Sequence, residues 1–428
     1  MPAIVHLDDL GFDAGGHLLV DRALAGLSPG DRLVVHGRHP ALGLHLAAWC
    51  RAEGHRLEPG PDERNPGGAM STATGDLGGE VSTGGRYGSA ATSGPGVITR
   101  TVLRGSADLD RWRGARRAGR TAADVVPHAD REWGLAARGA LVEPGGPPLA
   151  VDWVDRDLVW ADIAPRLYAQ ATANQWDPAT AVDWAAAGSV PEDVEDLVVQ
   201  VMTYLVENEQ AALMIPARML ARLHPHYREV MQLLAAQAAD EARHVEIFTR
   251  RALLRRDVLG LSGAGGRASL QTLLAEPDFT LASFLLSVLG EGSFLDLLHF
   301  LHRHAPDPVT ADVTRLAARD EARHVAFGVA HTAHVVRADP AFLHRLRNAV
   351  ERRHAVLADT AGLNRQVFDA LVVLAAGSWK PAAIARGWQE VLRLQEAMDA
   401  GRRRRLEYIG FPDDEAAAVS ALHTRNFM

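Results

Sequence analysis

The pattern of apolar and polar positions divides the chain into stretches of different character. From residue 151 to 428, apolar residues recur with a 3.6-residue period in long runs separated by short breaks, which predicts an all-helical domain. Residues 1–58 instead alternate short apolar runs with helix-like stretches around the turn Ser28 to Asp31, which predicts a compact β-α-β-α domain. The predicted fold class is therefore mainly α, a helical bundle with a small α/β N-terminal domain.

Two stretches of different composition connect these domains. Gly, Ser, Thr, Pro and Ala dominate residues 59–96, where apolar periodicity is weak, so we predict a flexible linker there. Residues 97–150 contain some apolar alternation and several prolines, and we leave them as an unassigned connecting segment that packs on either neighbour.

Composition and charge exclude several classes of protein. Of the 428 residues, 47% are hydrophobic and 23% charged, as in a globular enzyme. The net charge is −8, and the only basic run, Arg402 to Arg405, is interpreted as a solvated helix end, so we expect no nucleic-acid partner. We find no signal peptide and no apolar stretch near the roughly 20 residues that span a bilayer, so we expect a cytoplasmic protein without a membrane partner.

Cysteine usage limits the chemistry further. The only cysteine, Cys50, excludes an intrachain disulfide framework and any all-cysteine metal site. We interpret it as a buried apolar residue. Ligands for a metal must therefore come from His, Asp and Glu.

The strongest internal signal is a six-residue motif that occurs twice. Asp-Glu-Ala-Arg-His-Val at 240–245 recurs unchanged at 320–325. Residues three apart on a helix share a face, so Glu241 and His244 can reach one metal ion from consecutive turns. Glu321 and His324 repeat this arrangement. The repeat predicts two helix pairs related by pseudo-symmetry.

Two simpler interpretations of the motif were weighed. A salt-bridged helix face would also use these residue types. A third Glu-x-x-His occurs at Glu351 and His354, but it lacks the preceding Asp and has no second copy, so we interpret it as coincidental. Two identical six-residue copies are very improbable by chance, which favours the metal site.

A di-metal helical bundle also needs one further carboxylate from each of two partner helices. Glu291 lies on a mainly apolar stripe of its predicted helix and supplies this carboxylate for the second copy of the motif. Glu207 and Glu209 compete for the first copy. The stripe through Glu209 is the more apolar, although Pro216 can kink the helix and shift the phase, so we choose Glu209. Four carboxylates on apolar stripes would be costly to bury unpaired, and metal binding compensates for that cost.

Neighbours of these residues complete the predicted site. Asp240 and Asp320 are expected to accept the ring N–H of a ligand histidine across the bundle, and Arg243 and Arg323 to neutralise the two aspartates.

The glycines beside one predicted ligand point to irregular helix geometry. Gly290 and Gly292 flank Glu291, and each costs about 1 kcal/mol in a helix interior relative to alanine. A bulge or a simple kink is expected there.

Over most of residues 151–428 these motifs resemble the ferritin-like di-iron carboxylate oxygenases, which include multicomponent monooxygenase hydroxylases and N-oxygenases. The stretch ANQWDPATAVDW (173–184) and the closing RLEYIGF and ALHTRNFM add less specific similarity. The resemblance implies a ferritin-like bundle, O2 as co-substrate and two Fe ions, with Mn as the alternative metal. It assigns one metal to Glu209, Glu241 and His244 and the other to Glu291, Glu321 and His324, with some carboxylates bridging.

The resulting expectation is an O2-activating non-haem di-iron oxygenase that hydroxylates or N-oxygenates a small-molecule substrate. No catalytic residue separate from the metal ligands is expected. The sequence has no evident flavin or NAD motif, so we expect a ferredoxin or reductase as electron donor, and we leave a homodimer open. The alternatives are a ferroxidase or iron-handling protein, and a non-catalytic scaffold subunit of an oxygenase assembly.

Several further residues bear on this expectation. Radical-generating relatives of this fold carry a Tyr one turn beyond the first His, where this chain has Phe248. The repeat equivalent is Gly328, whose small size would leave room for substrate. We interpret His299, His331 and His334 as surface residues.

The N-terminal residues 1–58 resemble the TusA-type sulfur carriers through LSPGDRLVV and HPALGLHLAAWCRAEGHRLE. That family places Cys-Pro-x-Pro at the start of its first helix, where a thiolate is stabilised. The corresponding residues here are Ala14 to His17, without a cysteine. A docking or scaffolding role is therefore expected in place of sulfur transfer.

Overall fold

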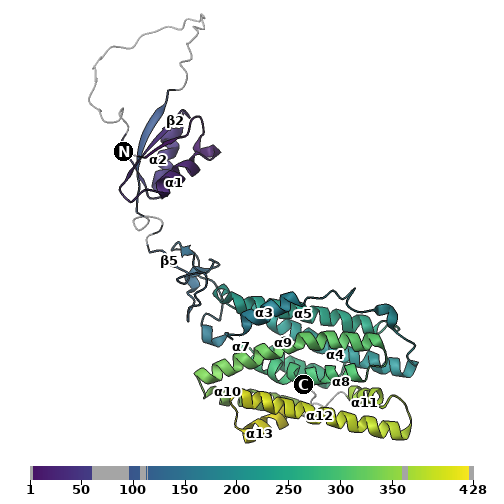
Figure 1. Cartoon of the computed structure of the whole chain (residues 1–428). Helices are drawn as coiled ribbons and strands as arrows, with labels where there is room; N and C mark the ends of the chain where they lie inside the picture. The colour runs from purple at the N-terminus through teal and green to yellow at the C-terminus, as the bar shows by residue number, and fades with distance from the viewer. Residues whose placement is uncertain (1–2, 60–95, 107–111, 113, 359–364, 424–428) are drawn as a thin grey trace, which may run out of the picture. The chain divides into compact units, whose positions relative to one another are not determined.

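The computed structural model describes residues 3–59, 96–106, 112, 114–358 and 365–423 (Figure 1). The chain forms two compact units. The N-terminal unit comprises Met1–Ala118 with Gly139–Pro147, and the helical unit comprises Gly119–Arg138 with Pro148–Met428. The predicted linker 59–96 lies outside the described residues except at its two ends. The mainly α fold class with a small α/β N-terminal part is confirmed.

The N-terminal unit is a mixed four-stranded sheet with two helices. The sheet order is β1-β2-β4-β3, with β1 parallel to β2, and β4 antiparallel to both β2 and β3. Its elements are β1 (Ala3–His6), α1 (Gly16–Ala25), β2 (Arg32–Gly37), α2 (Leu42–Ala52), β3 (Arg56–Leu57) and β4 (Ile98–Leu103), with a short 3-10 turn η1 (Phe12–Ala14). Within residues 1–58, the predicted order of strand, helix, strand and helix is followed by a further short strand, β3, which was not predicted.

The predicted boundary at residue 58 leaves out one strand of this sheet. β4 lies between β2 and β3 and pairs with β2 along its whole length, from Ile98 opposite Gly37 to Leu103 opposite Arg32. The apolar alternation at 97–103 was therefore the signal of a strand. The remainder of 97–150 is divided, because β5 (Arg116–Arg117) pairs with β6 (Leu141–Val142) in the N-terminal unit and Gly119–Arg138 belongs to the helical unit.

Cys50 belongs to helix α2, and its side chain lies in the apolar core between this helix and the sheet. Its side chain is 1% exposed and packs among Leu46, Val102 and their neighbours. Burial raises the pKa of the thiol to about 12. A thiol in this environment is an apolar core residue and is not a nucleophile at neutral pH.

The helical unit is built on two helical hairpins that pack against each other (Figure 1). In the first, α4 (Glu192–Leu220) turns through η6 (Pro225–Tyr227) into α5 (Arg228–Ala252). In the second, the π-helix η7 (Phe284–Glu291) continues as α8 (Gly292–Arg303), which turns into α9 (Pro308–Ala338). Asp307 caps α9 by accepting from the Thr310 N–H, and Pro308 occupies the first helical position.

Further helices cover the outside of these hairpins. Helix α3 packs on α5 and α9, α11 packs on α4, and α12 packs on α8. The covering helices are α3 (Ala164–Ala173), α6 (Ala264–Ala275), α7 (Phe279–Ser283), α10 (Phe342–Ala358), α11 (Arg365–Ala376), α12 (Pro381–Ile409) and α13 (Asp413–His423), with 3-10 turns η3 (Arg131–Trp133), η4 (Arg156–Leu158) and η5 (Trp184–Ala186).

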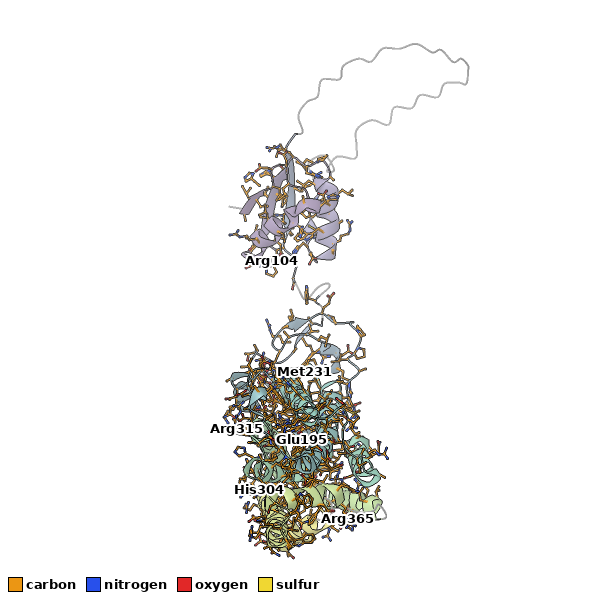
Figure 2. All side chains as sticks on the ribbon, turned by 90° about the vertical axis from the view of Figure 1, so that its right-hand side faces the viewer. Arg104, Glu195, Met231, His304, Arg315 and Arg365 are labelled. Atoms are coloured by element: carbon orange, nitrogen blue, oxygen red, sulfur yellow. The ribbon has the colours of Figure 1, made fainter. Side chains whose placement is uncertain are left out.

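A buried ion network joins the two hairpins at one end of the bundle. Arg251 of α5 is 1% exposed and donates to Glu195 of α4 at 2.6 Å and to Asp307 at the start of α9 at 2.7 Å. Its third bond is to the Thr310 hydroxyl at 2.7 Å. Figure 2 shows Glu195 inside the helical unit, where these contacts tie three chain segments together.

The run Arg402 to Arg405 on α12 is not simply a solvated helix end, as predicted. Arg403 and Arg404 are exposed, but Arg402 is only 1% exposed and donates to the Ser293 and Ser420 hydroxyls. Arg402 and the half-buried Arg405 face inward because the C-terminal part of α12 packs against the π-helix and the start of α8.

One stretch of the helical unit, Phe279–Arg303, is long and apolar enough to cross a membrane by length and composition. By length and composition, this segment contradicts the expectation that no apolar stretch approaches the length that spans a bilayer. Within the structure 89% of its most apolar window is buried, since this helix forms the inner wall of the second hairpin. Its apolar character is explained by burial in the core.

Candidate metal centre

The structure gathers all six predicted ligand residues in the middle of the bundle. Each comes from one of the four hairpin helices, and each is buried, with exposed fractions between 0% and 4%. They form two groups whose oxygen and nitrogen atoms lie within 4.8 Å of one another. The first group is Glu209, Glu241, His244 and Glu321, and the second is Glu241, Glu291, Glu321 and His324.

Glu241 and Glu321 belong to both groups. These two glutamates come from the two copies of the repeated motif and lie between the two histidines, so they are positioned to bridge two ions. Glu209 and Glu291 each belong to one group and occupy opposite ends of the cluster. The arrangement matches the set of two Glu and two Glu-x-x-His from four helices that di-metal carboxylate bundles use.

The choice between Glu209 and Glu207 can be examined directly. Glu209 is 1% exposed, and its Oε2 lies 3.3 Å from His244 Nδ1. Glu207 is half-buried and lies in neither group. The helical phase of α4 therefore directs Glu209 inward despite Pro216 within the helix.

The two histidines present the same ring atom to the carboxylates. His244 Nδ1 lies 3.1 Å from Glu241 Oε2 and 3.4 Å from Glu321 Oε1. His324 Nδ1 lies 3.0 Å from Glu241 Oε1 and 3.4 Å from Glu321 Oε2. Nδ1 is therefore the nitrogen available to a metal in both cases, and Nε2 faces away from the cluster.

The outward nitrogens meet the predicted aspartates across the bundle. His324 Nε2 lies 3.2 Å from Asp240 Oδ2, and His244 Nε2 lies 3.6 Å from Asp320 Oδ2. Each aspartate thus serves the histidine of the other motif copy. A carboxylate at this position fixes the tautomer in which Nε2 carries the proton and Nδ1 is free for a metal.

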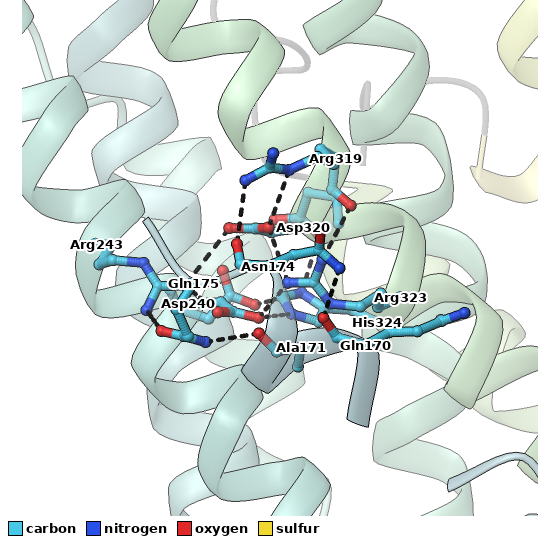
Figure 3. Close-up of polar contacts among 12 residues, drawn as sticks. Gln170, Ala171, Asn174, Gln175, Asp240, Arg243, Arg319, Asp320, Arg323 and His324 are labelled. Atoms are coloured by element: carbon cyan, nitrogen blue, oxygen red, sulfur yellow. Dashed lines mark hydrogen bonds and ion pairs between the residues drawn. The ribbon is translucent and has the colours of Figure 1, made fainter. Parts of the chain in front are cut away.

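The two arginines of the motif tie the aspartates together (Figure 3). Arg323 donates to Asp240 at 2.9 Å and to Asp320 at 2.8 Å. Arg243 donates to Asp240 and lies 3.5 Å from Asp320. The paired charges leave this layer of two aspartates and two arginines neutral.

Electrostatics around the aspartates favours their ionised form. Burial alone would raise the pKa of Asp320, but hydrogen bonds from His244 and Trp176 and the charge of Arg323 lower it well below its usual range. The pKa of Asp240 is lowered against burial in the same way by His324 and Arg323. Both side chains are therefore acceptors at neutral pH.

The glutamates of the cluster differ among themselves. Burial would raise the pKa of Glu241, but the charges of His324 and His244 and hydrogen bonds with them lower it well below its usual range. Burial raises the pKa of Glu209 and of Glu291 well above the usual value, and nearby glutamates raise it further. Burial would lower the pKa of His244, but the charge of Glu209 together with hydrogen bonds to Asp320, Glu209 and Glu241 raises it. Without a cation, the cluster concentrates more negative charge than it can bury.

Unpaired polar atoms test whether a metal fits here. Buried polar atoms without a hydrogen-bond partner are rare in native folds. Seven such atoms belong to the six ligand residues, namely Glu209 Oε1, Glu241 Oε1, His244 Nε2, Glu291 Oε2, Glu321 Oε1 and Oε2, and His324 Nδ1. Two divalent cations would balance the four glutamates and coordinate most of these atoms, so the residues present fit a di-metal group.

Glu291 is the last residue of a π-helix, so the helix is irregular where a bulge was predicted. The segment Phe284–Glu291 is π-helical, and Arg405 donates to the Val288 carbonyl within it at 2.8 Å. A Cβ at Gly292 would lie 2.4 Å from Arg405 Cζ. Glycine at 292 therefore lets Arg405 reach the backbone of the π-helix. Short π-helical segments of this kind are frequent at functional sites.

Gly328 does not leave room for a substrate, contrary to the sequence expectation. A Cβ there would lie 2.4 Å from Ser287 Cβ, so the glycine allows α9 to pack closely on the π-helix. Phe248, at the position where a radical-forming Tyr was considered, is fully buried with its ring 6.3 Å from that of His244.

A small cavity of about 20 Å³ lies beside the cluster. Glu209, Glu291 and Glu321 line one side of it, and Leu270 and Leu273 of α6 line the other. The space is sufficient for about one water-sized molecule. Helix α6 thus covers the carboxylates with apolar side chains.

Two residues that contact the site were not identified from the sequence. Trp176 donates its indole N–H to Asp320 Oδ2 at 2.7 Å, and Gln237 donates to Glu291 Oε1 at 3.0 Å. Gln237 is four residues before Glu241 on the same face of α5, which is the signal that could have found it. Trp176 lies in an irregular segment that periodicity does not place.

The other histidines are divided between surface and core. His299 is exposed and His334 is half-buried, but His331 is fully buried, contrary to the predicted surface position. Its Nδ1 lies 2.9 Å from the Trp160 carbonyl and its Nε2 3.0 Å from the Thr280 hydroxyl. His331 is a core histidine because the segment before α3 covers this face of α9.

The third Glu-x-x-His does not form a metal group among the described residues. Glu351 is exposed and pairs with Arg347 at 2.8 Å, and His354 Nδ1 lies 3.2 Å from the Leu422 carbonyl. This pair is a surface feature of α10.

No family model matches the chain, and no curated protein matches it. Among solved structures, the chain is similar to a point variant of an R2-like ligand-binding oxidase with an aerobically reconstituted Mn/Fe cofactor. The two sequences are 19% identical, and the match covers 58% of this chain and 94% of that chain, with a TM-score of 0.43. A second variant with an Fe/Fe cofactor is also 19% identical, covering 58% and 93% with a TM-score of 0.43. At this level of identity and overlap, the similarity by itself assigns neither a metal nor an activity to this chain.

Proposed function

We propose that the helical unit is an O2-dependent oxidoreductase with a non-haem di-metal centre. The observation that carries this proposal is the pair of overlapping groups that share Glu241 and Glu321, with seven unpaired atoms among the six residues. Ion pairs with the two histidines leave Glu209 Oε1 and Glu291 Oε2 without any partner, so ion pairing within the protein does not satisfy the cluster.

Iron is the proposed metal, with Mn as the alternative in one or both positions. The donors are carboxylate oxygens and imidazole nitrogens without a thiolate, a set that suits both metals. Glu209 and His244 would hold one ion, Glu291 and His324 the other, and Glu241 and Glu321 would lie between them. When bound in the reduced state, the pair would supply electrons for the activation of O2.

The surrounding residues have separate tasks in this proposal. Asp240 and Asp320 hold the imidazole protons on Nε2 and so keep Nδ1 available. Arg243 and Arg323 hold the aspartates ionised. Leu270 and Leu273 exclude bulk water from the carboxylates, which protects the centre from side reactions.

We further propose that the reaction is hydroxylation or N-oxygenation of a small molecule, with electrons from a separate ferredoxin or reductase. This finer assignment rests on the sequence resemblance and on the lack of an evident flavin or NAD motif. The cytoplasmic location and the homodimer remain predictions.

For the N-terminal unit we propose docking or scaffolding, on the basis of its resemblance to TusA-type carriers. Ala14 to His17 replace the sulfur-bearing motif, and Cys50 is buried. We therefore expect no persulfide to form on the chain when a cysteine desulfurase is supplied.

Oxygen uptake by the metal-loaded chain tests the enzymatic proposal. The protein is loaded anaerobically with Fe(II), mixed with O2 and a chemical reductant, and followed with an oxygen electrode. We expect repeated uptake by the wild type and none above background in Glu241→Ala or Glu321→Ala. Glu351→Ala, in the coincidental Glu-x-x-His, is the matched control and should retain full uptake.

The alternatives give different outcomes in the same experiment. A ferroxidase or storage protein would take up many irons per chain and elute as a large shell in size-exclusion chromatography. A scaffold subunit would consume no O2 in any variant. Unchanged uptake in both Glu241→Ala and Glu321→Ala would show that this cluster is not the reactive site.

A further inference from the structure

A second buried group in the helical unit lacks a partner. Arg353 of α10 is 6% exposed, and its guanidinium donates to the Thr272 hydroxyl at 3.0 Å and to the Ser269 hydroxyl at 2.7 Å. The remaining nitrogen, Nη1, is buried and has no hydrogen-bond partner. One donor of a buried cation is therefore left unsatisfied by the protein.

The charge of Arg353 is also uncompensated within the described part of the chain. Both of its bonds go to neutral hydroxyls, and no described carboxylate pairs with it. Burial lowers its pKa to about 10, so the guanidinium is still charged at neutral pH. The contrast with Arg251 is clear, because that buried arginine binds two carboxylates. A buried cation without an anion is unfavourable unless a ligand completes it.

Arg353 lines a cavity of about 480 Å³ between α6 and α10. Leu285 of the π-helix, Ala349 and Val356 give this cavity a mainly apolar wall. Arg352 and Glu276, which lie 3.6 Å apart, provide a neutralised ion pair in the same lining. The cavity thus combines one unpaired positive charge with an apolar surface.

A second unpaired nitrogen lies close to the same arginine. His423 is 5% exposed, its Nε2 has no hydrogen-bond partner, and it lines a smaller adjoining cavity together with Arg353 and Leu285. Two unpaired nitrogens at one place are the arrangement expected where an oxyanion binds.

We propose that this cavity binds a small molecule that carries one carboxylate or phosphate group on an apolar body, with its anionic group on Arg353. Size supports the assignment, since pockets for small organic ligands begin at roughly 300 Å³. A single available guanidinium nitrogen fits one oxyanion better than a polyanion. The proposal concerns a site separate from the di-metal cluster and does not depend on the metal or on the proposed reaction.

Calorimetric titration of the full chain, as purified, tests this inference with three probes that share one apolar body. Octanoate and octyl phosphate carry the two candidate anions, and 1-octanol carries none. We expect one anionic probe to bind with 1:1 stoichiometry and octanol to bind at least about tenfold more weakly. The tighter of the two anionic probes identifies which oxyanion the site prefers.

Matched variants locate the binding. Arg353→Met should weaken binding of the preferred anion at least about tenfold. Arg347→Met, which breaks only the exposed pair with Glu351 on the same helix and lies outside the lining, should change that affinity less than about threefold. Val356→Trp, at an exposed position of the cavity lining, should also weaken binding of the anion, because the larger side chain fills part of the cavity. This variant tests the proposal even if Arg353→Met does not fold. Equal affinity for octanol, or unchanged anion affinity in both Arg353→Met and Val356→Trp, would overturn the proposal.

Discussion

Asp240 of one motif copy lies 3.2 Å from Nε2 of His324 in the other copy, so each half of the repeat orients the histidine of its counterpart. The reciprocal contact runs from Asp320 to His244 at 3.6 Å. The Asp of Asp-Glu-Ala-Arg-His is therefore as much a part of the site as the Glu and the His. A single copy of the motif would be incomplete, which explains why the whole run of residues is duplicated.

The first prediction concerns this cross-bundle contact. Asp240→Asn preserves the size of the side chain but removes the negative charge that holds the proton on His324 Nε2. We expect metal affinity to fall by about 10- to 100-fold, measured by anaerobic titration against a competing chelator. Asp312→Asn on α9, the helix of His324, breaks only an exposed pair with Arg315; it is the control and should leave metal affinity unchanged. Equal losses in the two variants would contradict the account.

The second prediction concerns the π-helix. Gly292→Ala would place a methyl group against Arg405 and displace it from the Val288 carbonyl. We expect the free energy of unfolding in urea to fall by about 1–2 kcal/mol despite the better helix propensity of alanine. Gly266→Ala in α6, whose nearest neighbour is 4.0 Å away, should instead raise it by about 0.5–1 kcal/mol. If the free energy of unfolding changes in the same direction in both variants, the contact of Arg405 with the Val288 carbonyl does not stabilise this segment.

The third prediction concerns the buried ion network at the end of the bundle. Arg251→Met leaves Glu195 and Asp307 buried without their cation, and we expect a loss of about 3–5 kcal/mol in the free energy of unfolding. Arg256→Met, which removes the partner of the exposed Asp196, should cost at most about 1 kcal/mol. Both changes in the free energy of unfolding can be measured from the midpoints of denaturant unfolding, provided that the dependence on denaturant concentration is unchanged. A small loss in Arg251→Met would refute a structural role for the buried ion network.

The fourth prediction follows from His331. Burial lowers its pKa to about 4 in the folded chain, whereas an unfolded histidine titrates near 6.5. The unfolded state therefore binds more protons between these values, and stability present above pH 6.5 is lost as pH falls toward 4, by up to about 3 kcal/mol. His331→Gln should remove this part of the pH dependence, and His299→Gln at an exposed site should not. If the free energy of unfolding depends on pH in the same way in the wild type and in His331→Gln, the prediction is wrong.

Much of the candidate site was predictable because its ligands follow helical spacing. Glu241 with His244, and Glu321 with His324, are three residues apart, and the apolar stripe of α4 favoured Glu209 over Glu207. The glycines beside Glu291 signalled an irregular helix, although not that it would be a π-helix. These features are local in sequence, where periodicity carries information.

The remaining features depend on contacts between distant segments, which periodicity does not encode. β4 joins its sheet from beyond the predicted linker, and Trp176 reaches Asp320 from an irregular segment. His331 and Arg402 were expected at the surface because a polar residue on a long helix is usually exposed. Both are buried because additional segments cover α9 and α12 on sides that a two-layer bundle would leave open.

Anaerobic Fe(II) titration of the metal-free chain, with bound iron counted after gel filtration, shows whether the cluster holds two metal ions. We expect two irons per chain for the wild type, loss of tight binding in Glu241→Ala, and a full count of two in Glu207→Ala. A wild-type count of zero, one or many, or an unchanged count in Glu241→Ala, would contradict this expectation.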